Sequence, residues 1–217
     1  MIELIDIEKT YPGKHGRIHV LRGVTSTFPR GESIGILGQN GAGKSTLLRI
    51  MCGTERASFG VVRRHVDVSW PLGFSGSFAG SLTGAENLRF VCRIYGADIE
   101  EVTDFVAGFS ELGPSMHEPV KTYSSGMKSR LAFSLSMAVR FQVYVIDEAL
   151  AAGDVAFQRK CKKIFEERRA GSDVVMVSHS IEMIKEYCTR AGVLYGGKLT
   201  MYDTIDEANE VYMRAVS

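Results

Sequence analysis

The segment GQNGAGKST, residues 38–46, constrains the fold of this chain more than any other. It satisfies the pattern G-x-x-x-x-G-K-[ST] and lies between a short apolar run, SIGIL, and an apolar stretch of helical character, LLRIMC. Glycines allow the backbone N–H groups of such a loop to turn inward around phosphate oxygens, and the first turn of the following helix adds positive charge. The sequence therefore predicts a strand, a phosphate-binding loop and a helix that ends at Gly53.

Two side chains of this loop have specific expected roles. Lys44 would supply a full positive charge to the β and γ phosphates of a nucleotide, and the Ser45 hydroxyl would bind Mg²⁺. A glycine turn with a chance lysine is the alternative, but the strand before the loop and the helix after it favour phosphate binding. The expected nucleotide-binding residues of the loop are Gly38, Gln39, Asn40, Gly41, Ala42, Gly43, Lys44, Ser45 and Thr46.

Strands and helices alternate over most of the chain. MIELIDI and HVLRGVTSTF indicate strands near the N-terminus, and residues 59–70 return to strand character. VYVID at 143–147 and DVVMVSH at 173–179 are further strand candidates, each followed by a helical pattern, and AGVLYGGKLTMY indicates a final strand pair. This alternation predicts an α/β fold with a mainly parallel sheet that helices cover on both faces.

Residues 81–118 differ from the rest of the chain. LTGAENLRFVCRIYG and IEEVTDFVAGFSELG are amphipathic helical patterns with no strand between them, so we interpret this stretch as a helical insertion. We expect one domain over residues 1–217. Its core, with the N-terminal β region, would comprise 1–80 and 119–217, and the insertion would continue into a helix at 124–140.

Acidic residues and a histidine follow two of the predicted strands. The strand at 143–147 ends in Asp147 and Glu148, and the strand at 173–179 ends in His179. The carboxyl ends of parallel strands form the ligand edge of such a sheet. Asp147 would hold Mg²⁺, Glu148 would orient or deprotonate an attacking water, and His179 would contact the γ-phosphate. Surface acids and a structural or exposed histidine are the alternatives, which the upstream phosphate loop disfavours.

The segment KTYSSGMKSR, residues 121–130, indicates a second phosphate contact. Its serines and glycine precede an apolar stripe at helical spacing, yet Lys128 and Arg130 lie near the positive end of that helix, where cations are disfavoured unless an anion is close. Small residues and N–H groups at 124–126 would suit a phosphate. Because the loop at 38–46 already holds one side of a nucleotide, we expect this helix start to serve the nucleotide of another copy, in a two-fold homodimer.

Composition disfavours several other functions. The formal net charge is +1, so there is no broad basic field for nucleic acid. The four cysteines are far apart and lack zinc spacing, which predicts reduced thiols in a cytosolic protein. The N-terminal residues include acids and predict no secretory signal, and no apolar run approaches the roughly 18 residues of a membrane-spanning helix. Any membrane role would therefore come through a partner.

The order of these motifs strongly resembles the ATP-binding subunits of ABC transporters. YSSGMKSR is similar to the LSGGQ signature of that family, with Tyr123, Ser125 and Met127 as departures. The resemblance implies a P-loop NTPase core of the ABC ATPase type, with a mainly parallel sheet, an N-terminal antiparallel β region and an inserted helical subdomain. The signature residues that it implies bind nucleotide in trans are Ser124, Ser125 and Gly126.

The same resemblance assigns further roles. It implies that Asp147 is the Walker B acid, that Glu148 is the catalytic glutamate and that His179 is the switch histidine. It places Asp154 in the loop that crosses the dimer interface and Tyr11 as the aromatic that stacks on adenine. The expected cofactors are ATP and Mg²⁺, and the expected activity is ATP hydrolysis coupled to transmembrane transport.

A narrower resemblance covers residues 69–90 and 121–138, which look like subunits that power export of capsular polysaccharide, of the polysialic acid type. It implies a homodimer on the cytoplasmic face of the bacterial inner membrane, held there by an integral-membrane permease. Residues 76–88 would face that permease. A polysaccharide co-polymerase is a further expected partner, and the exported glycan would be contacted only indirectly. The alternative is an O-antigen or teichoic acid exporter.

One departure from the family pattern concerns residues 73–77. Most ABC ATPases carry a glutamine there, and this segment contains none. We therefore hypothesise slow turnover or looser coupling to the permease. Two rival functions are an ABC protein that acts on ribosomes or DNA and a nucleotide-gated switch with negligible hydrolysis. The single ATPase unit disfavours the first rival, and Glu148 with His179 disfavours the second.

Overall fold

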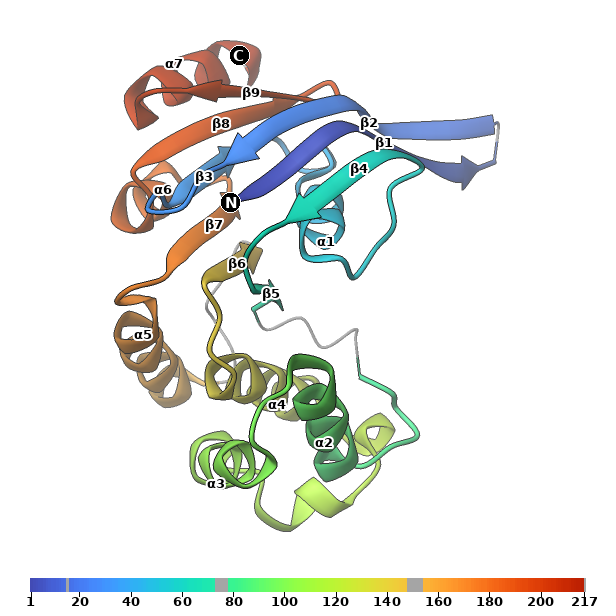
Figure 1. The fold of residues 1–217 in the computed structure, drawn as a ribbon, viewed down its shortest axis with the longest axis vertical. Coiled ribbons are helices and arrows are strands. Elements are labelled where there is room, and N and C mark those ends of the chain that lie inside the picture. The colour runs from blue at the N-terminus through green and yellow to red at the C-terminus, as the bar shows by residue number, and fades with distance from the viewer. Residues whose placement is uncertain (15, 73–77, 148–153, 217) are drawn as a thin grey trace. The chain divides into compact units, whose positions relative to one another are not determined.

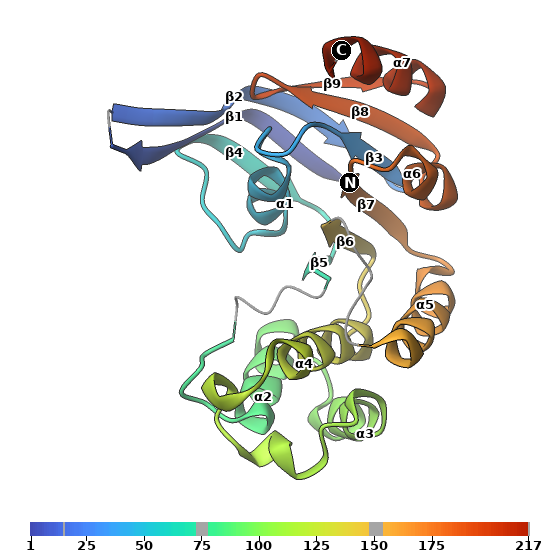
Figure 2. The same ribbon diagram turned by 180° about the vertical axis from the view of Figure 1, so that it is seen from behind.

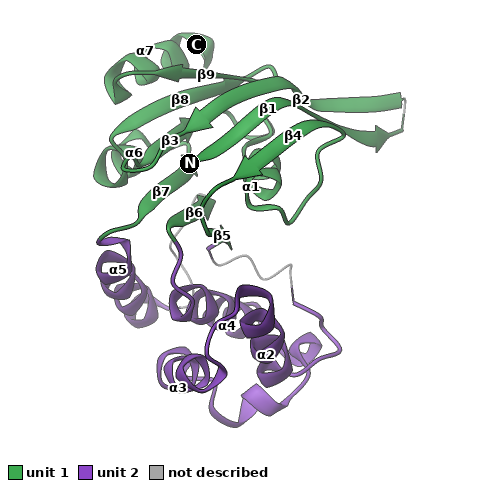
Figure 3. Ribbon diagram, viewed as in Figure 1, with its two compact units in different colours: residues 1–71, 142–148, 171–217 green, residues 72–141, 149–170 purple. Residues whose placement is uncertain are grey.

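The computed structural model describes residues 1–14, 16–72, 78–147 and 154–216, and it divides the chain into two compact units (Figure 3). Unit 1 comprises residues 1–71, 142–148 and 171–217, and unit 2 comprises 72–141 and 149–170. Glu148 and the segment 73–77, both singled out from the sequence, lie outside the described residues.

Unit 1 contains a six-stranded sheet in the order β5-β6-β7-β3-β8-β9 (Figure 1). Its first five strands pair in parallel, and β9 pairs antiparallel with β8. In chain order the strands are β3 (Ile34–Leu37), β5 (Val68–Pro71), β6 (Val143–Asp147), β7 (Asp173–Ser178), β8 (Arg190–Tyr195) and β9 (Lys198–Tyr202). All four residues of β3 are buried, as expected for a central strand that is covered on both faces. The predicted mainly parallel sheet is confirmed.

Unit 1 also contains a three-stranded antiparallel sheet in the order β2-β1-β4, which confirms the expected N-terminal β region. Its strands are β1 (Ile2–Gly13), β2 (Gly16–Phe28) and β4 (Phe59–Arg64). Helices α1 (Lys44–Cys52), α6 (Ile181–Tyr187) and α7 (Ile205–Val216) complete the unit (Figures 1 and 2). One hydrophobic core joins both sheets to α1 through buried side chains that include Ile7, Leu21, Ile36, Leu47 and Val145.

Unit 2 is helical. Its α-helices are α2 (Gly84–Tyr95), α3 (Ile99–Ser110), α4 (Ser125–Ala138) and α5 (Val155–Arg169), with short 3-10 helices η2 (Gly113–His117) and η3 (Val120–Thr122) between α3 and α4. Helix α2 begins at a capping box, in which Thr83 accepts from the Glu86 amide and the Glu86 carboxylate accepts from the Thr83 amide. Gly96 ends α2 in the left-handed conformation. None of the helices described in either unit is long and apolar enough to cross a membrane.

Unit 2 contains the expected insertion at 81–118 and α4, the helix into which the insertion was expected to continue, and it contains α5 as well. The reason is an aromatic cluster that joins three of its helices. The ring centroid of Phe109 on α3 lies 6.1 Å from that of Phe133 on α4 and 5.4 Å from that of Phe157 on α5. All three aromatic side chains are buried. Helix α5 was expected in the core, and it packs with the insertion through these contacts instead.

Candidate nucleotide-binding site

The loop between β3 and α1 has the conformation that its glycines predict. Gly41 has φ 82° and Gly43, the N-cap of α1, has φ 100°. L-residues with a side chain rarely adopt such angles. At Gly43 a β-carbon would also lie 2.8 Å from Cγ1 of Val20, so both the backbone angle and the packing require glycine there.

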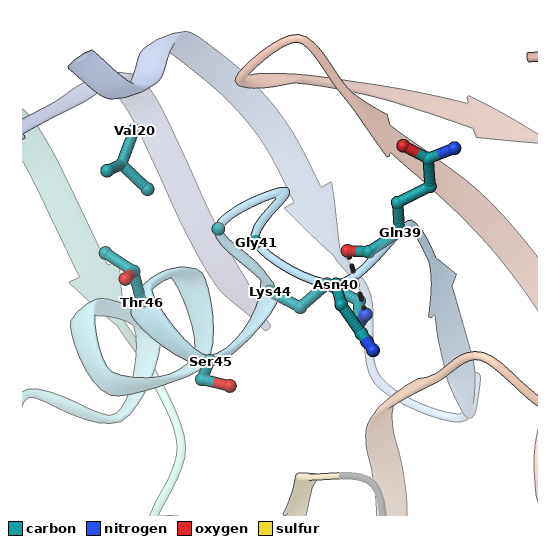
Figure 4. Close-up of a pocket in the computed structure, with 8 residues that line it drawn as sticks. Val20, Gln39, Asn40, Gly41, Lys44, Ser45 and Thr46 are labelled. Carbon is teal, nitrogen blue, oxygen red and sulfur yellow. Dashed lines mark hydrogen bonds between the residues drawn. The ribbon is translucent and has the colours of Figure 1, made fainter. Parts of the chain in front are cut away.

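A cavity of about 310 Å³ opens beside this loop (Figure 4). The lining residues are Val20, Gln39, Asn40, Gly41, Gly43, Lys44, Ser45 and Thr46. Seven of these eight belong to the segment 38–46 that was expected to bind nucleotide. Val20 comes from β2, and nothing in its local sequence indicated a role at the site.

Lys44 is held in place by the backbone of its own loop. Its side chain lies in the loop, where the residue is only 6% exposed. Its Nζ donates to the carbonyl oxygens of Gly38 at 2.6 Å and Gln39 at 3.1 Å. The ammonium is therefore directed into the curve of the loop, next to the backbone groups that would surround a phosphate.

The carboxyl ends of three neighbouring strands place further predicted residues at the same edge. In the sheet order β6-β7-β3, Asp147 is opposite Val177, and Leu37 is opposite Ser178. Asp147 is the last residue of β6, and His179 and Gly38 follow the paired ends of β7 and β3. The register therefore brings Asp147, His179 and the phosphate loop to the ligand edge of one sheet. Asp147 is partly buried, and His179 is exposed.

Tyr11 lies on β1 beside the cavity rather than among the lining residues given above. Its hydroxyl donates to Oε1 of Glu55 at 2.5 Å and lies 3.4 Å from Oγ1 of Thr46, which does line the cavity. Glu55, which sequence reasoning did not single out, follows the C-terminal end of α1. A lone glutamate two residues after the glycine that ends a helix carries no local signal for such a contact.

The signature segment forms the capped start of helix α4 in unit 2. Ser124 is the N-cap, and its hydroxyl accepts from the amide of Met127 at 3.2 Å. Ser124 and Ser125 are exposed, and Gly126 is partly exposed. The first turn of α4 therefore presents small residues at its positive end, which is the arrangement that phosphate binding requires.

Arg130 does not need a phosphate to balance its charge near this helix start. Its guanidinium donates to Oε2 of Glu111 at 2.6 Å and to Oδ2 of Asp154 at 2.7 Å. It also lies 4.5 Å from the ring centroid of Phe157. Asp154, expected in a loop at the dimer interface, is the N-cap of α5 and accepts from the amide of Phe157 at 3.0 Å. Two carboxylates of unit 2 thus supply the anion for Arg130 that the sequence left unidentified.

Comparison with known proteins decides the family. The family described as ABC transporter matches residues 21–151, which is more than half of the chain. The chain belongs to the ABC transporter family.

Two curated relatives of this ABC transporter subunit are similar over nearly their whole length. One is the capsule polysaccharide export ATP-binding protein CtrD of Neisseria meningitidis serogroup B, 49% identical over 98% of each chain. Another is the polysialic acid transport ATP-binding protein KpsT of Escherichia coli, 46% identical over 99% of each chain. Among solved structures, the ATP-binding cassette MJ0796, as a dimer bound to ADP and Pi, is similar with a TM-score of 0.73. That match has 20% identity and covers 94% of this chain and 99% of the other, so it establishes the fold.

Membership in the family also establishes the enzymatic class. The chain is an ATP-binding subunit whose ATPase activity is coupled to transport. The phosphate loop and the ligand edge of the sheet are the parts of unit 1 that were expected from the sequence to serve this activity. Glu148, the expected catalytic glutamate, immediately follows Asp147 in the sequence and lies outside the described residues.

Proposed function

We propose that this chain powers the export of capsular polysaccharide across the bacterial inner membrane, as an ATP-hydrolysing homodimer bound to a membrane permease. The observation that carries the ATPase part is the phosphate loop itself. Lys44 is oriented by two backbone carbonyl oxygens, 2.6 and 3.1 Å away, in a cavity bounded by the loop that carries it. A cation fixed in advance stabilises a polyphosphate and the charge that develops on it during transfer.

The other residues of unit 1 complete this electrostatic clamp. The amides of the glycine-rich loop and the positive end of α1 bind the β and γ phosphates together with Lys44. Glu148 accepts a proton from, or orients, the water that attacks the γ-phosphorus. His179, at the end of β7, contacts the γ-phosphate from the same edge. Little covalent chemistry is needed, so most of the catalysis comes from positioning these groups.

Magnesium fits the oxygen donors at this edge. The Ser45 side chain belongs to the cavity wall (Figure 4). Asp147 ends β6, which is separated from β3 by β7 in the same sheet. Hydroxyl and carboxylate oxygens are ligands that Mg²⁺ prefers. Ser45 and Asp147 would hold the ion, which when bound neutralises charge on the β and γ phosphates.

We propose that the signature residues of one copy complete the site of another. Ser124 to Gly126 offer the positive start of a 14-residue helix, and their exposure in a single chain supports a role in a second copy. ATP would then hold two chains together, because each γ-phosphate bridges a phosphate loop and a signature helix. Hydrolysis removes that bridge, and the pair reopens.

The names of the relatives favour capsule export over the O-antigen or teichoic acid alternative. CtrD and KpsT are named for capsule polysaccharide and polysialic acid, and each matches this chain over nearly its whole length. We therefore propose peripheral attachment at the cytoplasmic face through the permease, with a co-polymerase as a further partner and no nucleic acid. The 76–88 segment is the part that we expect to contact the permease.

The test is Glu148→Gln in the complex with the permease. The variant should bind ATP, nearly abolish phosphate release and trap homodimers that contain ATP, because the clamp remains and the water is no longer activated. In a capsulated host, it should leave polysaccharide inside the cell. Ser124→Ala combined with Gly126→Ala should prevent the trapped dimer while leaving ATP binding to the single chain. Full turnover by monomers would contradict the proposal.

A further inference from the structure

Tyr11 is part of a network of ion pairs and hydrogen bonds that sequence reasoning did not anticipate. At its centre, the carboxylate of Glu55 accepts from the Tyr11 hydroxyl at 2.5 Å, from Nζ of Lys9 at 2.7 Å and from Nε of Arg49 at 2.9 Å. We call this network the Glu55 cluster. Its members are Lys9, Tyr11, Thr46, Arg49 and Glu55.

The Glu55 cluster joins the phosphate-loop helix to the strand that carries the aromatic ring. Lys9 and Tyr11 are on β1, and Thr46 and Arg49 are on α1. Glu55 is tied to α1 by its own backbone, since its amide donates to the carbonyl oxygen of Arg49 at 3.1 Å. Moving the Tyr11 hydroxyl away from α1 would therefore break its hydrogen bond to the Glu55 carboxylate.

The cluster is shielded from solvent, which strengthens its contacts. The side chains of Lys9, Glu55 and Arg49 are 14%, 19% and 30% exposed. Pairs at this depth are screened less by water and salt than surface pairs. Burial would raise the pKa of Glu55, but hydrogen bonds from Lys9, Tyr11 and Arg49 lower that pKa to about 2. The carboxylate is therefore ionised, and available to the Tyr11 hydroxyl, at any physiological pH.

The tethered ring is next to the nucleotide cavity. The hydroxyl of Tyr11 lies 3.4 Å from Oγ1 of Thr46, which lines the cavity, and Arg49 donates to the same Thr46 oxygen at 3.3 Å. The Lys9 ammonium lies 5.0 Å from the ring centroid. A hydroxyl bonded at one end and an ammonium at the ring leave the aromatic side chain little rotational freedom. Thr46 connects this arrangement to the residues that hold phosphate.

We propose that Glu55 is a positioning residue for nucleotide recognition, because it fixes the Tyr11 ring beside the phosphate loop in the orientation that receives the adenine base. This inference rests on the proposed ATP-binding function and on the role that the family resemblance implies for Tyr11, which is to stack on adenine. A ring that is already oriented loses less conformational entropy when the base binds than a ring free to change rotamer. Glu55 would therefore affect affinity for adenine nucleotides, and it would leave affinity for a phosphate chain without a base unchanged.

The test compares two ligands by calorimetry on the full chain: adenylyl imidodiphosphate, a hydrolysis-resistant ATP analogue, and inorganic tripolyphosphate. Glu55→Ala should weaken binding of the ATP analogue about fivefold, as expected for freeing one aromatic side chain, and change tripolyphosphate affinity by less than about twofold. Tyr11→Phe keeps the ring and removes the hydroxyl, with its hydrogen bond to Glu55 and its longer contact with Thr46, so it should weaken binding of the ATP analogue to a similar extent. The double variant should bind the ATP analogue no more weakly than either single variant, because both substitutions remove the same hydrogen bond between Tyr11 and Glu55.

Glu32→Ala is the matched control. Glu32 also pairs with an arginine of unit 1, Arg190 at 3.0 Å, and it is not among the residues of the Glu55 cluster or the cavity lining. It should leave both affinities unchanged.

Equal losses for both ligands in Glu55→Ala, or losses that multiply in the double variant, would assign Glu55 a purely structural role and overturn the inference. If Glu55→Ala fails to fold, the Tyr11→Phe variant decides the question alone. If Tyr11→Phe binds the ATP analogue with wild-type affinity, the inference is overturned. A wild-type chain that binds tripolyphosphate as tightly as the analogue would instead refute the adenine site of the proposed function.

Discussion

Replacing Glu55 with glutamine should remove a pH-dependent part of the stability of unit 1. In the folded chain, burial opposes ionisation of this carboxyl, but the hydrogen bonds from Lys9, Tyr11 and Arg49 lower its pKa from 4.5 to about 2. The folded state therefore holds the ionised form more strongly than the unfolded state does. Because the folded pKa is the lower one, the stabilisation is fully present above pH 4.5 and is lost as the pH falls towards 2.

The magnitude follows from the difference between the two pKa values. Each pKa unit corresponds to about 1.4 kcal/mol, so the ionised carboxylate contributes about 3 kcal/mol to the free energy of unfolding at pH 7. At pH 3 the unfolded carboxyl is protonated while the folded one is still mostly ionised, and the contribution falls to about 1.4 kcal/mol. The Glu55 side chain is 19% exposed, and solvent screening lowers the energy of its ion pairs, so these values are upper limits.

Urea unfolding of the wild-type chain and of Glu55→Gln, followed by circular dichroism at pH 7, 5, 4 and 3, measures this contribution. The difference in unfolding free energy between the two proteins should narrow by about 2 kcal/mol between pH 5 and pH 3. Glutamine has nearly the same shape and does not titrate, so lost packing contributes equally at every pH. A difference in unfolding free energy that stays constant from pH 7 to pH 3 would show that the cluster does not stabilise the ionised form of Glu55.

Three further predictions concern the loop, unit 2 and the 73–77 segment. Gly43→Ala should weaken ATP binding at least tenfold in a calorimetric titration, because its β-carbon would meet Val20 at 2.8 Å and the backbone angle is unfavourable; wild-type affinity would contradict this. Phe133→Ala should lower the free energy of unfolding of unit 2 by about 3–5 kcal/mol, because the ring is only 1% exposed within the aromatic cluster. An unchanged melting temperature would contradict this. Ser75→Gln should raise phosphate release in the complex with the permease, and near-unchanged turnover would count against slow hydrolysis caused by the missing glutamine.

The residues of the phosphate loop could be identified from the sequence because their requirements are local. The positive φ angles of Gly41 and Gly43 and the position of Lys44 depend on a few neighbouring residues between one strand and one helix. Asp147 and His179 were also identifiable, because each ends an apolar strand and parallel strands end at a common edge. The cap at Ser124 follows from local chemistry in the same way.

Other features depend on contacts between residues far apart in the chain. Tyr11 and Glu55 are 44 residues apart, and Arg130 lies 19 residues from Glu111 and 24 from Asp154. No local pattern reports such pairs, since the packing of whole elements brings them together. For the same reason the sequence suggested a phosphate as the anion near Arg130, whereas the folded chain supplies two carboxylates.

The strand, loop and helix that we expect to bind phosphate, the parallel sheet and the residues at its ligand edge could all be predicted from the amino-acid sequence. Periodicity and glycine conformation act over short distances, so they can be read directly from neighbouring residues. The packing of α5 with the helical insertion, and the hydrogen bond by which Glu55 holds Tyr11 beside the phosphate loop, became visible only in the folded chain. Those outcomes depend on how the surfaces of separate elements fit together, and that fit exists only once the chain has folded.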